Sequence, residues 1–143
     1  MGYPQGDEAL QMMERFIRQS PLEALSPVAS QGEIRDAQAL FSQCQVSQPV
    51  MQYIAALCQA TRSDEQVQLG VSPRGMLALL RTAQAHAAIH GRDFATPDDV
   101  KALAVPVLSH RVILRGLYGR SGEGEKFIRE LLEKVPAPTE AQA

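Results

Sequence analysis

The chain has 143 residues, the size of a single domain that buries about two-thirds of the surface exposed by its unfolded form. Hydrophobic residues make up 45 % of the chain and aromatic residues only 5 %, a mixture that favours helices. The formal charge of −2 leaves no basic surplus for binding nucleic acid or an anionic membrane surface.

The two cysteines, Cys44 and Cys58, lie in apolar, helix-like surroundings without CxxC spacing. We expect both to be reduced core residues, as is usual in a cytosolic protein. No apolar run near the start fits a signal peptide, and none approaches the ~18 residues of a membrane span. These features predict a soluble protein of the cytoplasm.

The first predicted helix opens at Asp7, where acidic residues suit the helix dipole, and should end near Ser20. Its apolar positions fall on one face, which predicts burial. These positions are Leu10, Met13, Phe16 and Ile17. A connector rich in Pro and Ser follows, and we expect its apolar residues to be packed down. They are Leu22, Leu25 and Val28.

Two further helices follow the connector. Ser30 and Glu33 form a capping-box pair that opens the second helix, and Ser47 should cap the third. Apolar residues at helical spacing predict the buried face of each helix. The two faces are Ile34, Ala37, Phe41 and Cys44, and then Val50, Tyr53, Ile54 and Leu57.

The fourth helix is the best-marked element, and we expect it over residues 73–90. Ser72 can cap it, Pro73 suits its first position, and Gly91 follows its end as a C-terminal cap. Its predicted core positions are Met76, Leu79, Leu80, Ala83 and Ala87. The many alanines indicate close contact with a neighbouring helix.

Thr96 and Asp99 repeat the start signal, and they predict a fifth helix whose core stripe Pro106 interrupts. A last helix should carry Phe127 and Ile128 and end before Pro136. Residues 94–96 and 112–114 are short enough to be extended and could pair with each other. The predicted fold class is therefore all-α, a bundle of about five to six helices that could include one very short extended pair.

Arg74 stands in the first turn of the fourth helix, where the dipole disfavours a cation by roughly 0.3–1 kcal/mol at an exposed site. The same helix end is a natural anion site, because its free amides point at a ligand. An arginine placed there can join the backbone in holding a phosphate.

The block GVSPRG, its alanine-rich helix and the following HGRDFATPDDVKALAVPVLSHR resemble the C-terminal helical lid of the MoxR family of AAA+ ATPases. Shorter matches are GYP at 2–4, YI at 53–54, ATR at 60–62 and VPAP at 135–138. The resemblance implies a lid domain over residues 1–138, with a hinge at 1–6 and a frayed tail at 139–143. The ATPase core is absent from this sequence.

In this family the helix-opening arginine is the sensor-2 residue, so the resemblance implies that Arg74 contacts the terminal phosphate of ATP. Ser72 and Pro73 would place it, Leu77 could border the nucleotide, and Tyr3 in the hinge could border the adenine. Mg²⁺ would come from the ATPase core. The chain would not be an enzyme by itself, since it lacks Walker motifs.

The implied partners are the AAA+ core of the parent ATPase, neighbouring subunits of a hexameric ring, and proteins with von Willebrand A domains. The implied role is chaperone-like: the lid would relay nucleotide state around the ring. No nucleic-acid partner and no membrane span are expected.

Other candidate sites have simpler explanations. Gly119 and Gly124 have P-loop spacing, but Glu125, Lys126 and Phe127 follow in place of the required Lys and Ser or Thr. His86 and His90 lack a third metal ligand, which favours an exposed pair and no metal site. We expect Asp98 and Asp99 to be helix caps, His110 to be packed or capping, and Arg111 to be able to face a neighbouring subunit.

A histone-fold-like DNA-binding or scaffold module is the alternative, since a long helix, a short extended segment and a capped helix also suit that fold. The acidic balance argues against DNA. An independent enzyme ranks last, because no nucleophile motif stands out.

Overall fold

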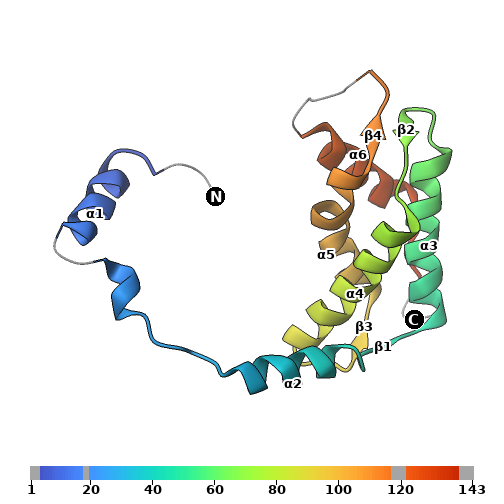
Figure 1. Cartoon of the computed structure of the whole chain (residues 1–143). Helices are drawn as coiled ribbons and strands as arrows, with labels where there is room; N and C mark the ends of the chain where they lie inside the picture. Colours follow the sequence, from blue (N-terminus) through green and yellow to red (C-terminus); the bar gives the residue numbers. More distant parts are fainter. Residues whose placement is uncertain (1–3, 18–19, 117–121, 139–143) are drawn as a thin grey trace. The chain divides into compact units, whose positions relative to one another are not determined.

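The computed structural model describes residues 4–17, 20–116 and 122–138, and the chain divides into two compact units (Figure 1). Unit 1 ends at Arg35 and unit 2 begins at Asp36. Unit 1 holds α1 (Asp7–Phe16), the 3-10 turn η1 (Pro21–Ala24) and the start of α2 (Gln31–Phe41). The expected hinge residues Gly2 and Tyr3, the expected tail at 139–143 and Gly119 lie outside the described residues.

Unit 2 is a helical bundle, which confirms the predicted all-α class. Its helices are α3 (Gln48–Ser63), α4 (Pro73–Ile89), α5 (Pro97–Leu108) and α6 (Glu123–Lys134), with η2 (Ser109–Arg111) after α5. The face predicted for α3 is buried, and so are Leu79, Ala83 and Ala87 of the face predicted for α4, whereas Met76 and Leu80 are only partly buried. The alanines of α4 allow the close approach to α5. The fully or nearly fully buried centre includes Val50, Leu57, Val71, Leu79, Ala83, Val100, Leu108 and Ile128.

Two short strand pairs close the ends of the bundle (Figure 1). At one end β1 (Gln45–Val46) runs parallel to β3 (Phe94–Ala95), and at the other β2 (Val67–Leu69) is antiparallel to β4 (Ile113–Leu114). The expected pairing of 94–96 with 112–114 is therefore wrong. The two segments pair instead with β1 and β2, which lie in stretches predicted to be loops. Strands of two or three residues are too short to show a hydrophobic period, so the sequence did not reveal them.

The capping signals were mostly correct. Ser30 and Glu33 exchange the two bonds of a capping box, with distances of 3.2 Å and 2.7 Å. Gly91 follows α4 with a φ of 72°, a conformation that favours glycine. Ser47 precedes α3 as predicted, but its side chain makes no capping bond, and its buried hydroxyl has no partner in the described residues.

Unit 1 differs from the prediction. Neither α1 nor α2 contains a buried residue, and Cys44, expected to continue the apolar face of α2, lies beyond the helix end. The connector is not packed down either, because no element among the described residues of unit 1 covers it. Its apolar residues are mostly exposed: Leu22 by 69 %, Leu25 by 73 % and Val28 by 100 %.

Asp99 ties α5 to the end of α4. Its side chain is only 2 % exposed and completes the predicted capping box by accepting a 2.7 Å bond from the backbone N–H of Thr96. Arg92 donates two bonds to the same carboxylate, at 2.6 and 2.7 Å, His86 Nδ1 donates one at 2.6 Å, and Thr96 Oγ1 donates one at 2.9 Å. Burial raises the pKa of this carboxyl, but the hydrogen bonds from Arg92, Thr96 and His86 outweigh it and hold the pKa well below its usual value.

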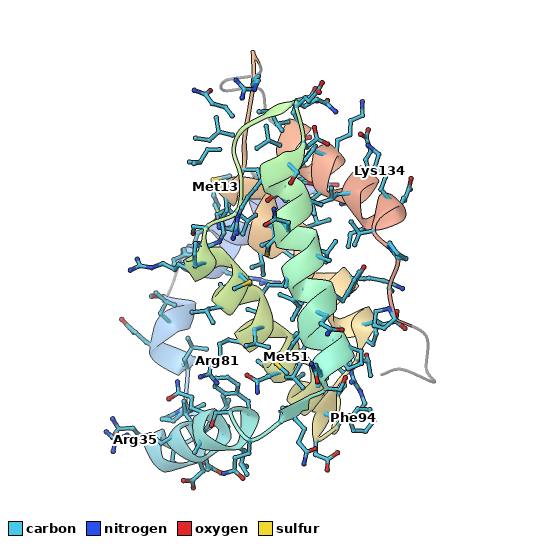
Figure 2. All side chains as sticks on the ribbon, turned by 90° about the vertical axis from the view of Figure 1, so that its right-hand side faces the viewer. Met13, Arg35, Met51, Arg81, Phe94 and Lys134 are labelled. Atoms are coloured by element: carbon cyan, nitrogen blue, oxygen red, sulfur yellow. The ribbon has the colours of Figure 1, made fainter. Side chains whose placement is uncertain are left out.

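Figure 2 shows two apolar side chains at the β1–β3 end, Met51 and Phe94, which are 45 % and 52 % exposed. Single exposed apolar residues of this kind are ordinary on protein surfaces.

No helix in the described ranges is both long and apolar enough to cross a membrane.

Replacing Asp99 with Asn should lower the free energy of unfolding by about 2–4 kcal/mol at neutral pH, because Arg92 would lose its buried partner. Since the folded-state pKa of Asp99 is depressed, its contribution is present above the unfolded-state pKa and is lost as the pH falls below about 4. Urea unfolding at several pH values measures both effects. The exposed neighbour Asp98→Asn is the control, and an equal pH dependence in both variants would contradict this assignment.

Candidate functional site

The first turn of α4 presents Arg74 to solvent. Ser72 precedes the helix in an extended conformation, and its hydroxyl accepts a 3.3 Å bond from the N–H of Gly75, which confirms the predicted cap. Pro73 occupies the first helical position. The guanidinium of Arg74 is exposed and, within the described residues, forms no ion pair and no side-chain hydrogen bond. A cation therefore stands free at the positive end of a helix.

The residue before this turn, Val71, is held through both of its backbone polar groups. Its N–H donates a 3.0 Å bond to Thr61 Oγ1, and its carbonyl accepts a 2.8 Å bond from Arg62 Nε. Thr61 and Arg62 belong to the ATR segment at the end of α3, which is one of the shorter matches to the MoxR family. We call these two bonds, from Val71 N–H to Thr61 and from Arg62 to the Val71 carbonyl, the clamp. The clamp could not be found from the sequence, because it depends on how residues 64–70 return the chain to α3.

The chain passes close to its neighbours on both sides of Val71. A Cβ on Gly70 would lie 2.8 Å from the carbonyl oxygen of Thr61, so only glycine fits there without a shift. A Cβ on Gly75 would lie 2.7 Å from Val71 Cγ1 and 3.2 Å from Arg111 Cδ. Gly75 is buried, and the two glycines allow the start of α4 to lie against α3 and η2.

Leu77, one turn after Arg74, is 56 % exposed, so the two predicted nucleotide-facing residues of α4 lie on the surface. Tyr3, the remaining predicted contact, lies outside the described residues. Arg111 is half-buried, and its Nε donates a 2.9 Å bond to the carbonyl of Val107. A role for Arg111 toward a neighbouring subunit stays a prediction.

The histidines differ in part from expectation. His90 is exposed and bonds through Nδ1 to the carbonyl of His86, at the helix end that suits it. His86, however, is half-buried and bonds to Asp99. This partner is thirteen residues away, so helical spacing does not reveal it. His110 is exposed and not packed. In the described ranges no group of three or more His, Cys, Asp or Glu could hold a metal ion.

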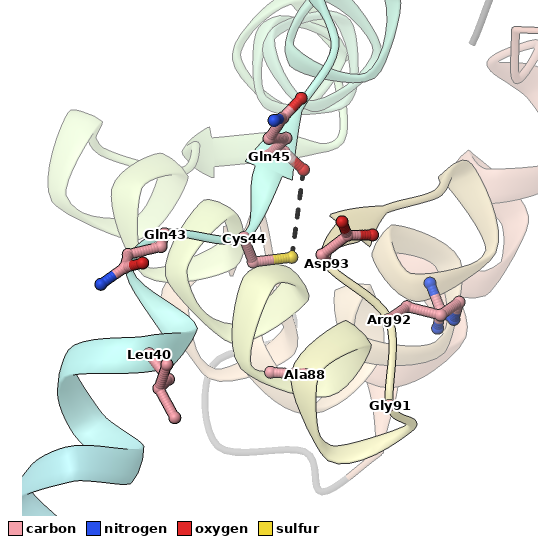
Figure 3. Close-up of a pocket in the computed structure, with 8 residues that line it drawn as sticks. All are labelled: Leu40, Gln43, Cys44, Gln45, Ala88, Gly91, Arg92 and Asp93. Carbon is pink, nitrogen blue, oxygen red and sulfur yellow. Dashed lines mark hydrogen bonds between the residues drawn. The ribbon is translucent and has the colours of Figure 1, made fainter.

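A hollow in unit 2 lies between the last turn of α2, at Leu40, and the loop after α4 (Figure 3). Cys44 faces it, with its thiol 4.0 Å from the carbonyl oxygen of Gln45. Burial, followed by the nearby charge of Asp99, raises the pKa of the Cys44 thiol. Since a thiolate is the reactive form, this cysteine is a poor nucleophile. Arg92 on the same wall is already paired with Asp99, so the hollow offers no reactive group.

Several known proteins are similar to this chain. The uncharacterized protein YeaC of Bacillus subtilis (strain 168) is 35 % identical over 144 residues, which cover 100 % of this chain and 45 % of YeaC. Chaperone MoxR1 of Mycobacterium tuberculosis is 29 % identical over 123 residues, covering 80 % of this chain and 32 % of MoxR1. The crystal structure of a candidate ATPase of Cytophaga hutchinsonii matches 97 % of this chain and 45 % of its own, with a TM-score of 0.81 and 22 % identity.

The structural match supports the fold alone, and the chain spans less than half the length of each of these three proteins. The AAA lid domain family matches residues 59–134, just over half of the chain, a range that includes the clamp and the start of α4. This match leaves the histone-fold-like alternative without support. The chain therefore belongs to the AAA lid domain family and is a lid domain of the MoxR type.

Proposed function

We propose that this lid closes over ATP bound to an AAA+ core and presents Arg74 to the γ-phosphate. The observation that carries the proposal is the exposed guanidinium in the first turn of α4, which has no carboxylate partner within the described residues. Pro73 has no N–H, and the N–H groups of Gly75 and Met76 bond to Ser72, so the Arg74 guanidinium and its own backbone N–H are the donors that this turn offers to a phosphate. The proposed contact would offset the unfavourable dipole.

The residues around Arg74 fit a nucleotide. Ser72 and Pro73 fix the turn that carries the arginine, and the exposed Leu77 offers an apolar surface one turn away. An adenine contact by Tyr3 is part of the same proposal. Bound ATP with Mg²⁺ would supply the phosphoryl group and the charge neutralisation of the reaction, with the metal held by the core.

The chemical step would belong to the core and not to this chain. ATP hydrolysis of the AAA+ type needs a phosphate-cradling loop, a magnesium-binding acid and a group that orients water. The sequence has no Walker A motif, because the spacing at Gly119 and Gly124 ends in the wrong residues. In this proposal the lid, over the predicted extent 1–138, contributes charge and movement.

Unit 1 suggests how the chain attaches to that core. The four apolar residues of the predicted α1 face are all more than half exposed, from 53 % for Met13 to 75 % for Ile17. A ten-residue helix is marginal in water unless its apolar face is covered. The relatives contain more than half of their length outside the aligned region, so the proposed covering partner is the AAA+ core.

The wider setting follows from the family. AAA+ proteins act as rings, and we propose a hexamer in which lid movement passes nucleotide state to the next subunit. A chaperone-like role is proposed because one relative is a chaperone, and von Willebrand A domain proteins are proposed partners. A cytoplasmic setting suits the buried free thiols of Cys44 and Cys58.

Replacing Arg74 with Ala, in a protein that joins this lid to its AAA+ core, should reduce ATP turnover by roughly 10- to 100-fold, the value of one charge-assisted contact. Steady-state ATPase assays and nucleotide titrations measure the change. Arg81→Ala is the matched control, since Arg81 is also an exposed arginine of α4 and lies two turns further on (Figure 2). Unchanged affinity and turnover in Arg74→Ala would remove the proposed role.

Replacing both Leu10 and Phe16 with Glu should weaken binding of this chain to its AAA+ core by at least about tenfold, because each change removes an apolar contact and buries a charge. The thermal unfolding of unit 2 should not change, since both residues lie in unit 1. Calorimetric titration against the separately produced core measures binding. Gln11→Glu, on the polar face of α1, is the control, and equal affinities in both variants would argue against docking through this face.

A further inference from the structure

We infer that Thr61 and Arg62 are positioning residues for Arg74, fixing the direction in which α4 leaves α3. The inference rests on the proposed function, and it concerns residues outside the predicted nucleotide contacts. Val71 stands three residues before Arg74 and is the point at which the incoming chain binds α3. A shift of Val71 would move the whole first turn of α4.

Thr61 uses its hydroxyl twice. The side chain is completely buried, donates a 2.7 Å bond to the carbonyl of Cys58, and accepts the 3.0 Å bond from the N–H of Val71. A hydroxyl engaged in both directions has one orientation, which holds Val71 in one place. Serine can reproduce both bonds, whereas valine has nearly the same shape and can make neither.

Arg62 holds the other polar group of the same residue. Its Nε binds the carbonyl of Val71, and no carboxylate of the described residues pairs with its guanidinium. The backbone of Gly70 lies in close contact with the Arg62 side chain, since a Cβ added to Gly70 would lie 2.8 Å from Arg62 Cγ. Arg62 therefore holds the end of α3 and the start of α4 at a fixed separation.

The far side of Val71 is also closed. Its side chain is completely buried, and Cγ1 lies where a side chain on Gly75 would have to go. Backbone bonds on one side and close packing on the other couple the first turn of α4 to α3. A force on Arg74 from a γ-phosphate would then move α3 and α4 together, which a lid requires to transmit nucleotide state.

The test is a double-mutant cycle in a protein that joins the lid to its AAA+ core. Thr61→Val should lower kcat for ATP by about threefold to tenfold, because a small misplacement of a charge reduces its effect on the transition state. Thr61→Ser should restore kcat to within about twofold of the original, since it keeps both hydrogen bonds. In the Arg74→Ala background, Thr61→Val should have no further effect on kcat.

Ile128→Val is the control for general loss of stability, because it removes one buried methylene from α6. Its effect on kcat should multiply with that of Arg74→Ala. If the effect of Thr61→Val also multiplied, the positioning role would be overturned while the proposed function survived. If Arg74→Ala alone had no effect, the proposed function would fail, and this inference with it.

A second readout needs no ATP. In the 143-residue chain, amide hydrogen exchange at Val71 should accelerate by about 10- to 100-fold in Thr61→Val, because the N–H loses its acceptor, and stay slow in Thr61→Ser. Exchange at Ala83, in the middle of α4, should stay unchanged in both variants. An unaltered rate at Val71 in Thr61→Val would overturn the clamp itself.

Discussion

The two hydrogen bonds that hold the backbone of Val71 are the constraint on which the rest of the candidate site depends. Thr61 binds its N–H and Arg62 its carbonyl, so the chain entering α4 is fixed before the helix begins. Ser72 and Pro73 then set the first turn, and Arg74 emerges at the surface. Two buried residues, Thr61 and Val71, together with the exposed Arg62 thus determine where the charge of Arg74 stands, which links the core of the bundle to the proposed chemistry.

Structural features that depend on a few neighbouring residues could be predicted from the sequence. The capping pairs at Ser30 and Thr96 formed as expected, because each depends only on residues within one helical turn. The buried stripes of α3 and α4 also formed, because a helix that packs on one face must repeat apolar residues at its own period. The family resemblance depended on the same local block around Arg74.

Contacts between distant segments could not be predicted. Val67 pairs with Leu114 and Gln45 with Phe94, and each partner segment is too short to carry a period. The bonds from His86 and Arg92 to Asp99 arise only when α4 and α5 pack together, so Asp99 looked like a simple cap. The periodicity of α1 correctly predicted a helix with one apolar face, but the predicted burial of that face is wrong, because nothing in the described residues covers it.

A bundle stabilised by its own core carries, at the start of α4, a charge that has no counter-charge within the described residues. The central claim is that this charge meets the terminal phosphate of ATP. The most direct measurement is a structure of the longer protein with a non-hydrolysable ATP analogue bound. The account predicts an Arg74 guanidinium nitrogen within about 3 Å of a γ-phosphate oxygen, whereas an Arg74 that stays in solvent with the nucleotide bound would contradict it.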